Sequence, residues 1–395
     1  MTIFEEALDL KDYTIQHRRD FHKHPELGFQ EHRSAKIIAD ELKGLGLEVT
    51  TGVGTTGVVG LLKGRADYPV VLLRFDMDAL PILEENEVDY ASEDPGKMHA
   101  CGHDSHMAVG LTVARLLAAR KDQLPGTIKF VFQPAEEGDG GAERMVAEGV
   151  LENPKPDYSI AMHVWNEKQV GWFGLAAGPV MAGSEIFKVT LTGKGGHGAS
   201  PHQPADPIVA AAQIITALQT VVSRNVNPLD TAVLSVCTVD AGTAFNIIPQ
   251  QAVFSGTIRF FKPVIHKKIN DRFVDIVNHI SDAMGCRVEI EITEITVPVV
   301  NDPNVARVMA EAVREIQMDA TVDTHYQTMG SEDFSFMMQD IPGCFMFVGS
   351  ANAEKGLNFG HHHPRFNIDE ACLPPAAAII AQSATTILEK HKKSQ

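Results

Sequence analysis

Two short stretches contain the residues of this chain that are best suited to chemistry. Residues 98–106, Met-His-Ala-Cys-Gly-His-Asp-Ser-His, place Cys101 and His103 in one glycine-punctuated turn, and a later Gln-Pro-Ala-Glu-Glu segment ends in Glu136 and Glu137. Thiolate, imidazole and carboxylate are the ligands of a borderline divalent metal. A second carboxylate beside a ligating one can accept a proton from a metal-activated water. These residue types therefore predict a two-metal hydrolase centre.

Three predicted strands lead to these groups or to similar ones. Their apolar runs cover residues 68–75, 127–132 and 158–165. Such runs are typical of strands buried on both faces of an α/β sheet, where functional groups gather beyond the carboxyl ends. Asp76 and Asp78 follow the first run, and we expect them to orient His103, because a ligating imidazole usually donates its other N–H to a carboxylate. His163 lies near the end of the third run and is compatible with either a ligand or a hydrogen-bonded core histidine.

Other histidines are candidate site residues, and the sequence supports some of them more strongly than others. Residues 361–363 are three consecutive histidines followed by proline, and we expect one of the three to be a ligand. His106 lies three residues beyond His103 at the start of a predicted helix, which favours a structural or capping role. His197 lies in a glycine-rich loop, where a loop residue and a functional residue are equally compatible with the sequence.

The five cysteines are scattered and show no paired spacing. Cys101 precedes a predicted helix over 107–120, whose N-terminal dipole should favour the thiolate and lower its pKa. The others are expected to be small, buried apolar residues, namely Cys237, Cys286, Cys344 and Cys372. An odd, unpaired set, together with a start that lacks a secretion signal, predicts a reduced, cytoplasmic protein.

Size and charge limit the remaining possibilities. A chain of 395 residues exceeds the size of a single growing core, so two domains are expected. The net charge of −17 argues against a nucleic-acid partner, which needs basic patches to displace counterions. No uninterrupted apolar run reaches the length of a membrane span, so we expect no membrane partner.

The pattern of elements predicts an inserted domain. Before residue 180 the strands are continuous apolar runs, whereas the strand at 185–192 alternates as a half-exposed strand does. The elements that follow have the order β-α-β-β-α-β of a ferredoxin-like module. We therefore expect an α/β catalytic domain from 1–180 and 297–395, with a mixed, mostly parallel sheet flanked by helices, interrupted by a ferredoxin-like α+β domain at 181–296.

One motif is expected to carry no function. Residues 52–57, Gly-Val-Gly-Thr-Thr-Gly, match the spacing of a dinucleotide-binding fingerprint. That fingerprint requires a helix after the glycines, but Val58–Leu62 continues as a strand. We interpret the segment as a β-turn.

Taken together, the motifs resemble the aminoacylase, hippurate hydrolase and indole-acetyl-amino-acid hydrolase branch of the dinuclear metallopeptidase family. The resemblance runs nearly end to end, and Cys101 stands where much of the family has a bridging aspartate. The segments that carry it are residues 17–28, 98–106, 133–138, 195–201 and 329–334.

The resemblance implies a role for each site residue. Glu136 would be the general base. Two divalent metal ions would be bound, with manganese or zinc favoured and cobalt or nickel also compatible. Cys101 would bridge the ions, and the ligands on one side of it would be His103 and Glu137. The ligands on the other side would be His163 and, from its place two residues before Pro364, His362.

The same resemblance assigns the inserted domain, 181–296, as a lid and dimerisation domain on a zinc-exopeptidase-like catalytic domain. His197 would stabilise an oxyanion in its own or a partner subunit's active site. Asn246 and Arg259 would bind the substrate carboxylate. A homodimer or higher homo-oligomer is implied.

The predicted activity is hydrolysis of a small N-acyl amino acid to a carboxylic acid and a free amino acid. The sequence leaves the acyl group open between acetyl, benzoyl, indole-acetyl and longer groups. A dipeptidase or exopeptidase using the same site is the alternative within the class. A cysteine hydrolase using Cys101 with His103, and a non-catalytic metal or peptide binder, are further alternatives; Glu136 argues against the binder, which needs no base.

Overall fold

The computed structural model describes residues 1–393, which fold into two compact units. Unit 1 comprises Met1–Val180, Val300–Gln327 and the chain from Asp333 onward, and unit 2 comprises Met181–Val299 and Thr328–Glu332. The chain passes from unit 1 to unit 2 between Val180 and Met181 and returns to unit 1 between Val299 and Val300. The short segment Thr328–Glu332, which the sequence alone placed in the catalytic domain, groups with unit 2.

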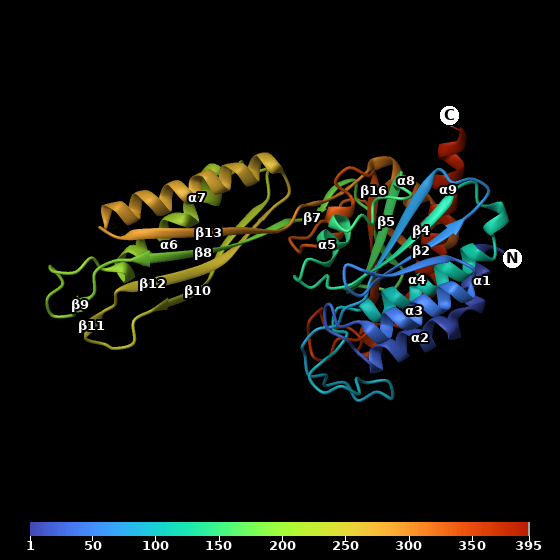
Figure 1. The fold of residues 1–395 in the computed structure, drawn as a ribbon, viewed down its shortest axis with the longest axis horizontal. Coiled ribbons are helices and arrows are strands. Elements are labelled where there is room, and N and C mark those ends of the chain that lie inside the picture. Colours follow the sequence, from blue (N-terminus) through green and yellow to red (C-terminus); the bar gives the residue numbers. More distant parts are fainter. Residues whose placement is uncertain (394–395) are drawn as a thin grey trace. The chain divides into compact units, whose positions relative to one another are not determined.

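Unit 1 is built on a sheet of eight strands (Figure 1). In sheet order they are β1 (Glu48–Val53), β2 (Gly57–Lys63), β4 (Thr127–Gln133), β3 (Val70–Asp76), β5 (Tyr158–Gln169), β16 (Gly343–Ala351), β6 (Trp172–Gly174) and β15 (Thr321–Asp323). The four central strands, β4, β3, β5 and β16, are mutually parallel, and the edges contain antiparallel pairs. The predicted mixed, mostly parallel sheet is therefore confirmed.

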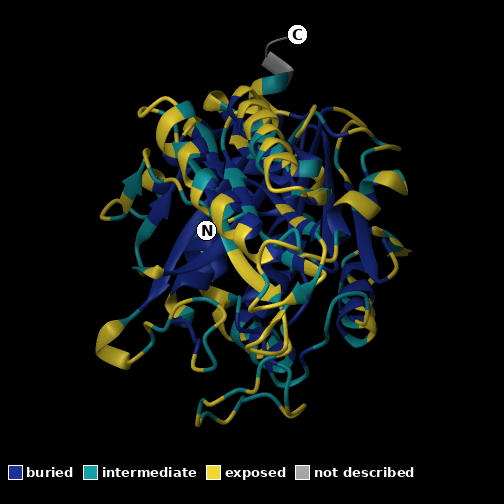
Figure 2. Ribbon diagram, turned by 90° about the vertical axis from the view of Figure 1, so that its left-hand side faces the viewer, coloured by how far each residue is buried: buried dark blue, intermediate teal, exposed yellow. Residues whose placement is uncertain are grey.

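Helices flank this sheet and are its main cover. They are α1 (Ile3–Asp9), α2 (Lys11–Lys23), α3 (His32–Gly44), α4 (His103–Ala118), α5 (Gly141–Ala147), α8 (Pro303–Ile316) and α9 (Leu373–Lys393). Short 3-10 turns connect other parts of the chain: η1 (Lys121–Gln123), η2 (Asp333–Met337), η3 (Ala353–Lys355) and η4 (Glu370–Cys372). The strands are largely buried, whereas exposed residues gather on helices and loops (Figure 2).

The central strands place chemical groups at one edge of the sheet. Every residue of β3 and β4 is buried, as their continuous apolar sequences predicted. The parallel register pairs Asp76 with Gln133, so the segments that follow the two strands begin side by side. Helix α4 begins at His103, earlier than the predicted start at residue 107. Gly102 precedes the helix and has a φ of 91°. A left-handed backbone at that position favours glycine.

Unit 2 contains a four-stranded antiparallel sheet with two helices on one face (Figure 1). The sheet order is β10 (Ala232–Ala241), β12 (Gln251–Phe260), β8 (Gly183–Thr192) and β13 (Arg287–Thr296), and the helices are α6 (Pro207–Asn225) and α7 (Pro263–Ala283). A short pair in unit 2 joins β9 (Gly196–His197) to β11 (Ile247–Ile248). A second short pair, β7 (Gly178–Met181) with β14 (Val299–Asn301), lies where the chain leaves and re-enters unit 1. This is the expected ferredoxin-like arrangement.

Two further expectations can be compared with the structure. The Gly-Val-Gly-Thr-Thr-Gly segment forms the turn of the antiparallel β1–β2 hairpin, as the strand that follows it indicated. Two helical stretches, Pro207–Asn225 and Glu370–His391, have the length and apolar composition of a membrane span. In the second, 78% of the apolar window is buried inside the protein, which is typical of a core helix; in the first, 33% is buried.

Candidate metal centre

The residues predicted to bind metal come together in unit 1. Cys101 and His103 precede and open α4, the two glutamates follow β4, and His163 lies on β5. The structure forms three overlapping groups whose ligand atoms lie within 4.8 Å of one another. They are Cys101, His103 and His163; Cys101, Glu137 and His362; and His103, Glu136 and Glu137. All five predicted ligands and the predicted base are therefore neighbours.

His103 has the hydrogen bonding of a metal ligand. Its Nδ1 donates to the backbone oxygen of Asp78 at 2.9 Å and lies 3.3 Å from the Asp78 carboxylate. Its Nε2 is buried and makes no hydrogen bond within the described chain. Burial opposes a charge on this ring, but Asp76 and Asp78 outweigh that effect and raise the pKa of His103 to about 10. A cation at Nε2 would displace that proton.

His163 presents one nitrogen toward the thiol. Its Nδ1 donates to the backbone oxygen of Val164 at 2.6 Å, so the proton of the neutral ring resides on Nδ1. Its Nε2 lies 3.4 Å from the sulfur of Cys101. Burial, reinforced by His106 and His361, holds the pKa of His163 well below its usual value. The ring is therefore neutral, as a metal ligand must be.

Cys101 departs from the expectation based on the helix dipole. Burial, with the adjacent charges of Glu137 and Glu136, raises the pKa of its thiol well above the usual range. These effects act against the stabilisation that the N-terminal dipole of α4 gives to a thiolate. A thiol among carboxylates becomes a thiolate when cations balance the charge, so the donor set fits metal ions.

The structure separates the three consecutive histidines. His362, with φ 63°, places Nε2 3.2 Å from a carboxylate oxygen of Glu137 and belongs to one of the ligand groups. His361 instead accepts a hydrogen bond from the backbone N–H of Asn166 at 3.2 Å, and its Nδ1 is 3.9 Å from the Cys101 sulfur. His363 accepts from the backbone of Arg365. This geometry favours His362 as the ligand.

Asp76, the last residue of β3, and Asp78, two residues further on, orient different histidines. Asp78 engages His103, as expected, and also accepts the backbone N–H of Glu137 at 3.0 Å. Asp76 accepts a 2.5 Å hydrogen bond from Nδ1 of His106, while Nε2 of His103 lies 3.8 Å from Asp76, beyond hydrogen-bond distance. His106 also accepts the backbone N–H of Val164, so both its nitrogens are engaged in structural contacts.

A buried network that the sequence reasoning missed joins the ends of β3 and β4. Arg74 donates to Gln133 at 2.8 Å and to Asp76 at 2.6 Å. Asp333 accepts from Gln133 at 2.7 Å and from the backbone of Ala142 at 2.9 Å. Asp333 belongs to the Met-Gly-Ser-Glu-Asp-Phe motif, so this motif braces the strand ends that precede the site.

A second buried network that the sequence did not predict supports the first turn of α4, immediately after His103. Asp104 lies 2.8 Å from Nε of Arg18 and 2.7 Å from Nδ1 of His22, and all three side chains are buried. Burial alone would raise the pKa of Asp104, but Arg18 and His22 outweigh it and lower that pKa. Arg18 and His22 both belong to the histidine-rich motif at residues 17–28. This motif therefore has a structural role, because it binds the buried carboxylate of Asp104.

Glu31 holds the turn that carries the glutamate pair. One carboxylate oxygen accepts the backbone N–H of Ala135 at 2.9 Å, and the other accepts the hydroxyl of Thr56 at 2.5 Å. Ala135 has φ 53°, a left-handed conformation that an external hydrogen bond can stabilise. Burial raises the pKa of Glu31 to about 7. Glu31 thereby positions the residue immediately before Glu136.

Replacing Glu31 with glutamine should change how stability depends on pH. Because the folded pKa of about 7 exceeds the unfolded value, the folded state holds a proton that the unfolded state releases. That contribution to stability is complete below about pH 4.5 and is lost as pH rises through 7. We therefore expect the free energy of unfolding of Glu31→Gln, relative to wild type, to improve from pH 5 to pH 8.

Urea unfolding of both proteins at each pH measures this difference. Groups that titrate alike in both proteins cancel in the comparison. A difference between variant and wild type that stays constant with pH would contradict a raised pKa at Glu31.

The remaining predicted residues lie in unit 2. His197 accepts the backbone N–H of Ala199 at Nδ1, so its Nε2 carries the proton and is a donor when the ring is neutral. Asn246 is exposed, and its backbone oxygen accepts from Gly198 in the same loop pair. Arg259 is half-buried, bonds to Thr257 and contacts no carboxylate among the residues that the structure describes. These features suit an oxyanion donor and a carboxylate receptor.

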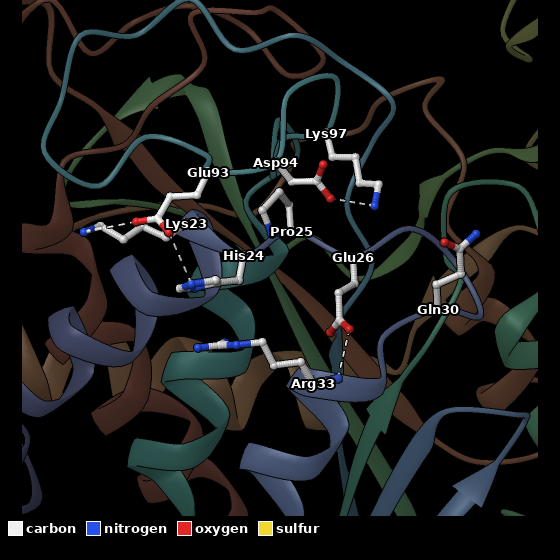
Figure 3. A pocket seen from close by; sticks show the side chains of 9 residues that line it. All are labelled: Lys23, His24, Pro25, Glu26, Gln30, Arg33, Glu93, Asp94 and Lys97. Carbon is white, nitrogen blue, oxygen red and sulfur yellow. Dashed lines mark hydrogen bonds and ion pairs between the residues drawn. The ribbon is translucent and has the colours of Figure 1, made fainter.

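A separate polar pocket in unit 1 does not share residues with these ligand groups (Figure 3). Its volume is about 420 Å³, and several of its polar groups already have partners: Lys97 pairs with Asp94 at 2.7 Å, and Glu26 accepts the backbone N–H of Arg33 at 2.9 Å. The lining residues are Lys23, His24, Pro25, Glu26, Gln30, Arg33, Glu93, Asp94 and Lys97. Nothing in its geometry indicates a ligand.

Known proteins match this chain along most of its length. The thermostable carboxypeptidase 2 of Saccharolobus solfataricus is 39% identical, with 92% of this chain and 93% of that protein covered. The IAA-amino acid hydrolase ILR1-like 4 of Arabidopsis thaliana is 38% identical, with 98% and 88% covered. The N-acetyl-L-cysteine deacetylase of Bacillus subtilis is 37% identical, with 98% and 91% covered.

Solved structures agree with the sequence matches. The Bacillus subtilis YXEP protein, described as a dinuclear metal binding peptidase from the M20 family, superposes with a TM-score of 0.84 at 34% identity. The alignment covers 96% of this chain and 99% of that one. The sequence profile described as Peptidase family M20/M25/M40 matches residues 72–386. Because this profile and these relatives match most of its length, the chain belongs to Peptidase family M20/M25/M40.

Proposed function

We propose that this protein hydrolyses the amide bond of N-acyl amino acids, releasing a carboxylic acid and a free amino acid. The observation that carries the proposal is a carboxylate, Glu136, grouped with a ligating set of thiol, imidazole and carboxylate. The names of the deacetylase and the IAA-amino acid hydrolase among the relatives support this reaction class.

Two divalent metal ions fit the site. The buried Nε2 of His103 that makes no hydrogen bond, the Nε2 of His163 that faces the Cys101 sulfur, and that thiol itself are a donor set for manganese or zinc, and cobalt or nickel also suit it. Glu137 and His362 complete the proposed ligands. Bound ions would supply a Lewis acid and lower the pKa of a bound water.

Glu136 performs the proton transfers in the proposed reaction. Its carboxylate accepts a proton from the attacking water as the water oxygen bonds to the amide carbon. When the C–N bond breaks, the same carboxyl group donates that proton to the departing nitrogen. The amine leaves neutral, and the water oxygen remains in the carboxylic acid product.

Groups of unit 2 complete substrate recognition in this proposal. The Nε2–H of His197 donates to the developing oxyanion. Arg259 binds the carboxylate on the part of the substrate that becomes the free amino acid, because a guanidinium can donate to both carboxylate oxygens. Asn246 assists through its amide. A free carboxylate is thereby required next to the scissile bond.

Replacing Arg259 with alanine should weaken catalysis selectively for substrates with a free carboxylate. Losing a hydrogen-bonded charge pair costs about 1.5–3 kcal/mol, so kcat/KM should fall by about 10- to 150-fold for an N-acyl amino acid. It should change little for the corresponding N-acyl amino acid amide. Arg287→Ala removes an exposed arginine from β13 of the same sheet and serves as the control. If kcat/KM fell equally for the acid and the amide, Arg259 would not be the group that binds the carboxylate.

The reaction class is tested by measuring amino-acid release from a panel of N-acetyl, N-benzoyl and N-indoleacetyl amino acids. We expect release with manganese or zinc, its loss with a chelator and its recovery when metal is returned. The preferred acyl group identifies the natural substrate class. A metal-loaded enzyme that releases no amino acid from any panel member would overturn the proposal.

An exopeptidase is the second candidate function, because one relative is named as a carboxypeptidase. A carboxypeptidase substrate also ends in a free carboxylate, so Arg259 suits both activities. N-acetyl amino acids, compared at equal concentration with peptides that end in the same amino acid, separate the two. Higher kcat/KM for the peptides would favour the exopeptidase.

The proposal extends to cytoplasmic localisation and to a homodimer formed through unit 2. Five free thiols support a reducing compartment. The apolar residues Ile208, Val209, Phe245 and Ile247 of unit 2 are exposed, which supports a self-association surface. Sedimentation of the protein tests the dimer, with a monomer at micromolar concentration as the contradicting result.

A further inference from the structure

We propose a second metal site, in unit 2, that binds one divalent cation such as zinc. It consists of Glu185 on β8, Glu294 on β13, and His266 and Asn270 on α7. The ligand atoms of the two glutamates and His266 lie within 4.8 Å of one another. None of these residues has a role in the proposed hydrolysis. Strands β8 and β13 and helix α7 bring them together within unit 2.

Two carboxylates face each other across the sheet at this point. The antiparallel register pairs Glu185 of β8 directly with Glu294 of β13. Directly opposed like charges destabilise a strand pair, and Glu185 is only 4% exposed. A buried carboxylate requires a compensating charge or ligand. The pair therefore needs positive charge beside it, which a protonated His266 or a bound cation can supply.

The helix supplies nitrogen and amide groups to the same point. Nε2 of His266 lies 2.5 Å from Glu185, and Nδ2 of Asn270 lies 3.0 Å from both Glu185 and His266. The two residues are four apart on α7, so they share one face. The ring of His266 stacks on Phe260 at 4.0 Å and 7°, which fixes its plane.

The amide of Asn270 has an unused acceptor. Its Oδ1 is buried and finds no hydrogen-bond partner anywhere in residues 1–393. The oxygen and nitrogen of an amide exchange places by rotation about a single side-chain torsion. That rotation would direct Oδ1 toward His266 and Glu185. Imidazole nitrogen, carboxylate oxygens and amide oxygen then form a ligand set for zinc or manganese.

Charge balance distinguishes a metal from a proton at this site. Glu185 and Glu294 carry two negative charges, and a protonated His266 returns only one. The hydrogen bond to Glu185 and the charges of both glutamates raise the pKa of His266 against the opposing effect of its partial burial. A divalent cation with a neutral imidazole balances both carboxylates. Metal and proton therefore compete, so binding should weaken as pH falls.

Metal content measures the site directly. After equilibration with zinc and removal of weakly bound ions, elemental analysis should find one equivalent less zinc in His266→Ala and in Glu294→Gln than in wild type. Glu294 is exposed, so its replacement should leave the fold intact. Glu291→Gln is the matched control, since Glu291 lies on the same strand and pairs with Lys188 at 3.2 Å. Equal zinc in all four proteins would overturn the proposal.

Hydrogen exchange of wild type locates the ion without a variant. Zinc should slow amide exchange in β8, β13 and α7 at pH 7.5, and much less at pH 5.5. Ions bound by the Cys101 cluster protect unit 1 instead, so the two sites give separate signals. Unchanged exchange in unit 2 at pH 7.5, with zinc saturating unit 1, would also overturn the proposal.

Discussion

Replacing Glu136 with glutamine should lower kcat by about 10²- to 10⁴-fold, which is the range for loss of a general acid–base group. The amide keeps the size of the side chain but cannot accept the proton of the attacking water. Because Glu136 is not among the proposed ligands, metal content should remain at the wild-type level. The measurement is kcat for the preferred N-acyl amino acid, together with elemental analysis of the variant.

A matched control is available next to the site. Glu143→Gln removes an exposed carboxylate from α5, shortly after Glu136 in the chain, and should leave kcat unchanged. If Glu136→Gln kept full activity with normal metal content, Glu136 could not be the base, and the proton would have to move by another group.

Replacing Cys101 with alanine should remove both metal and activity. Cys101 lies in two of the ligand groups, with His163 in one and His362 in the other, as a bridging ligand requires. Loss of groups that merely orient ligands typically costs 10- to 100-fold in metal affinity or activity, so loss of the bridge should exceed about 100-fold. Cys101→Asp, which restores an anionic ligand, should recover part of both.

Thiol alkylation separates this role from nucleophilic catalysis by Cys101. In the metal-loaded protein the sulfur would be ligated, so bound metal should protect Cys101 from an alkylating reagent. Peptide mapping is needed because Cys237 is exposed, not buried as its sequence context predicted, and should also react. Inactivation by modification of Cys101 that metal does not slow, with activity that survives a chelator, would indicate the cysteine hydrolase instead.

The sequence by itself determined the features that depend on neighbouring residues along the chain. The continuous apolar runs identified the buried parallel strands, and the alternating pattern after residue 180 identified a different second unit. Cys101 with His103, and Glu136 with Glu137, were recognisable because each pair lies in one turn. The strand after Gly57 excluded the nucleotide motif. Periodicity and short spacing are sufficient for such inferences.

Only the tertiary structure decided the features that depend on distant contacts. Glu31 and Ala135 are 104 residues apart, and Gln133 and Asp333 are 200 apart, so no local pattern predicts that they meet. The preference for His362 over its neighbours follows from the direction of each ring, which the fold of the loop sets. The raised pKa of the Cys101 thiol follows from burial and converging carboxylates, and both effects exist only when the chain is folded.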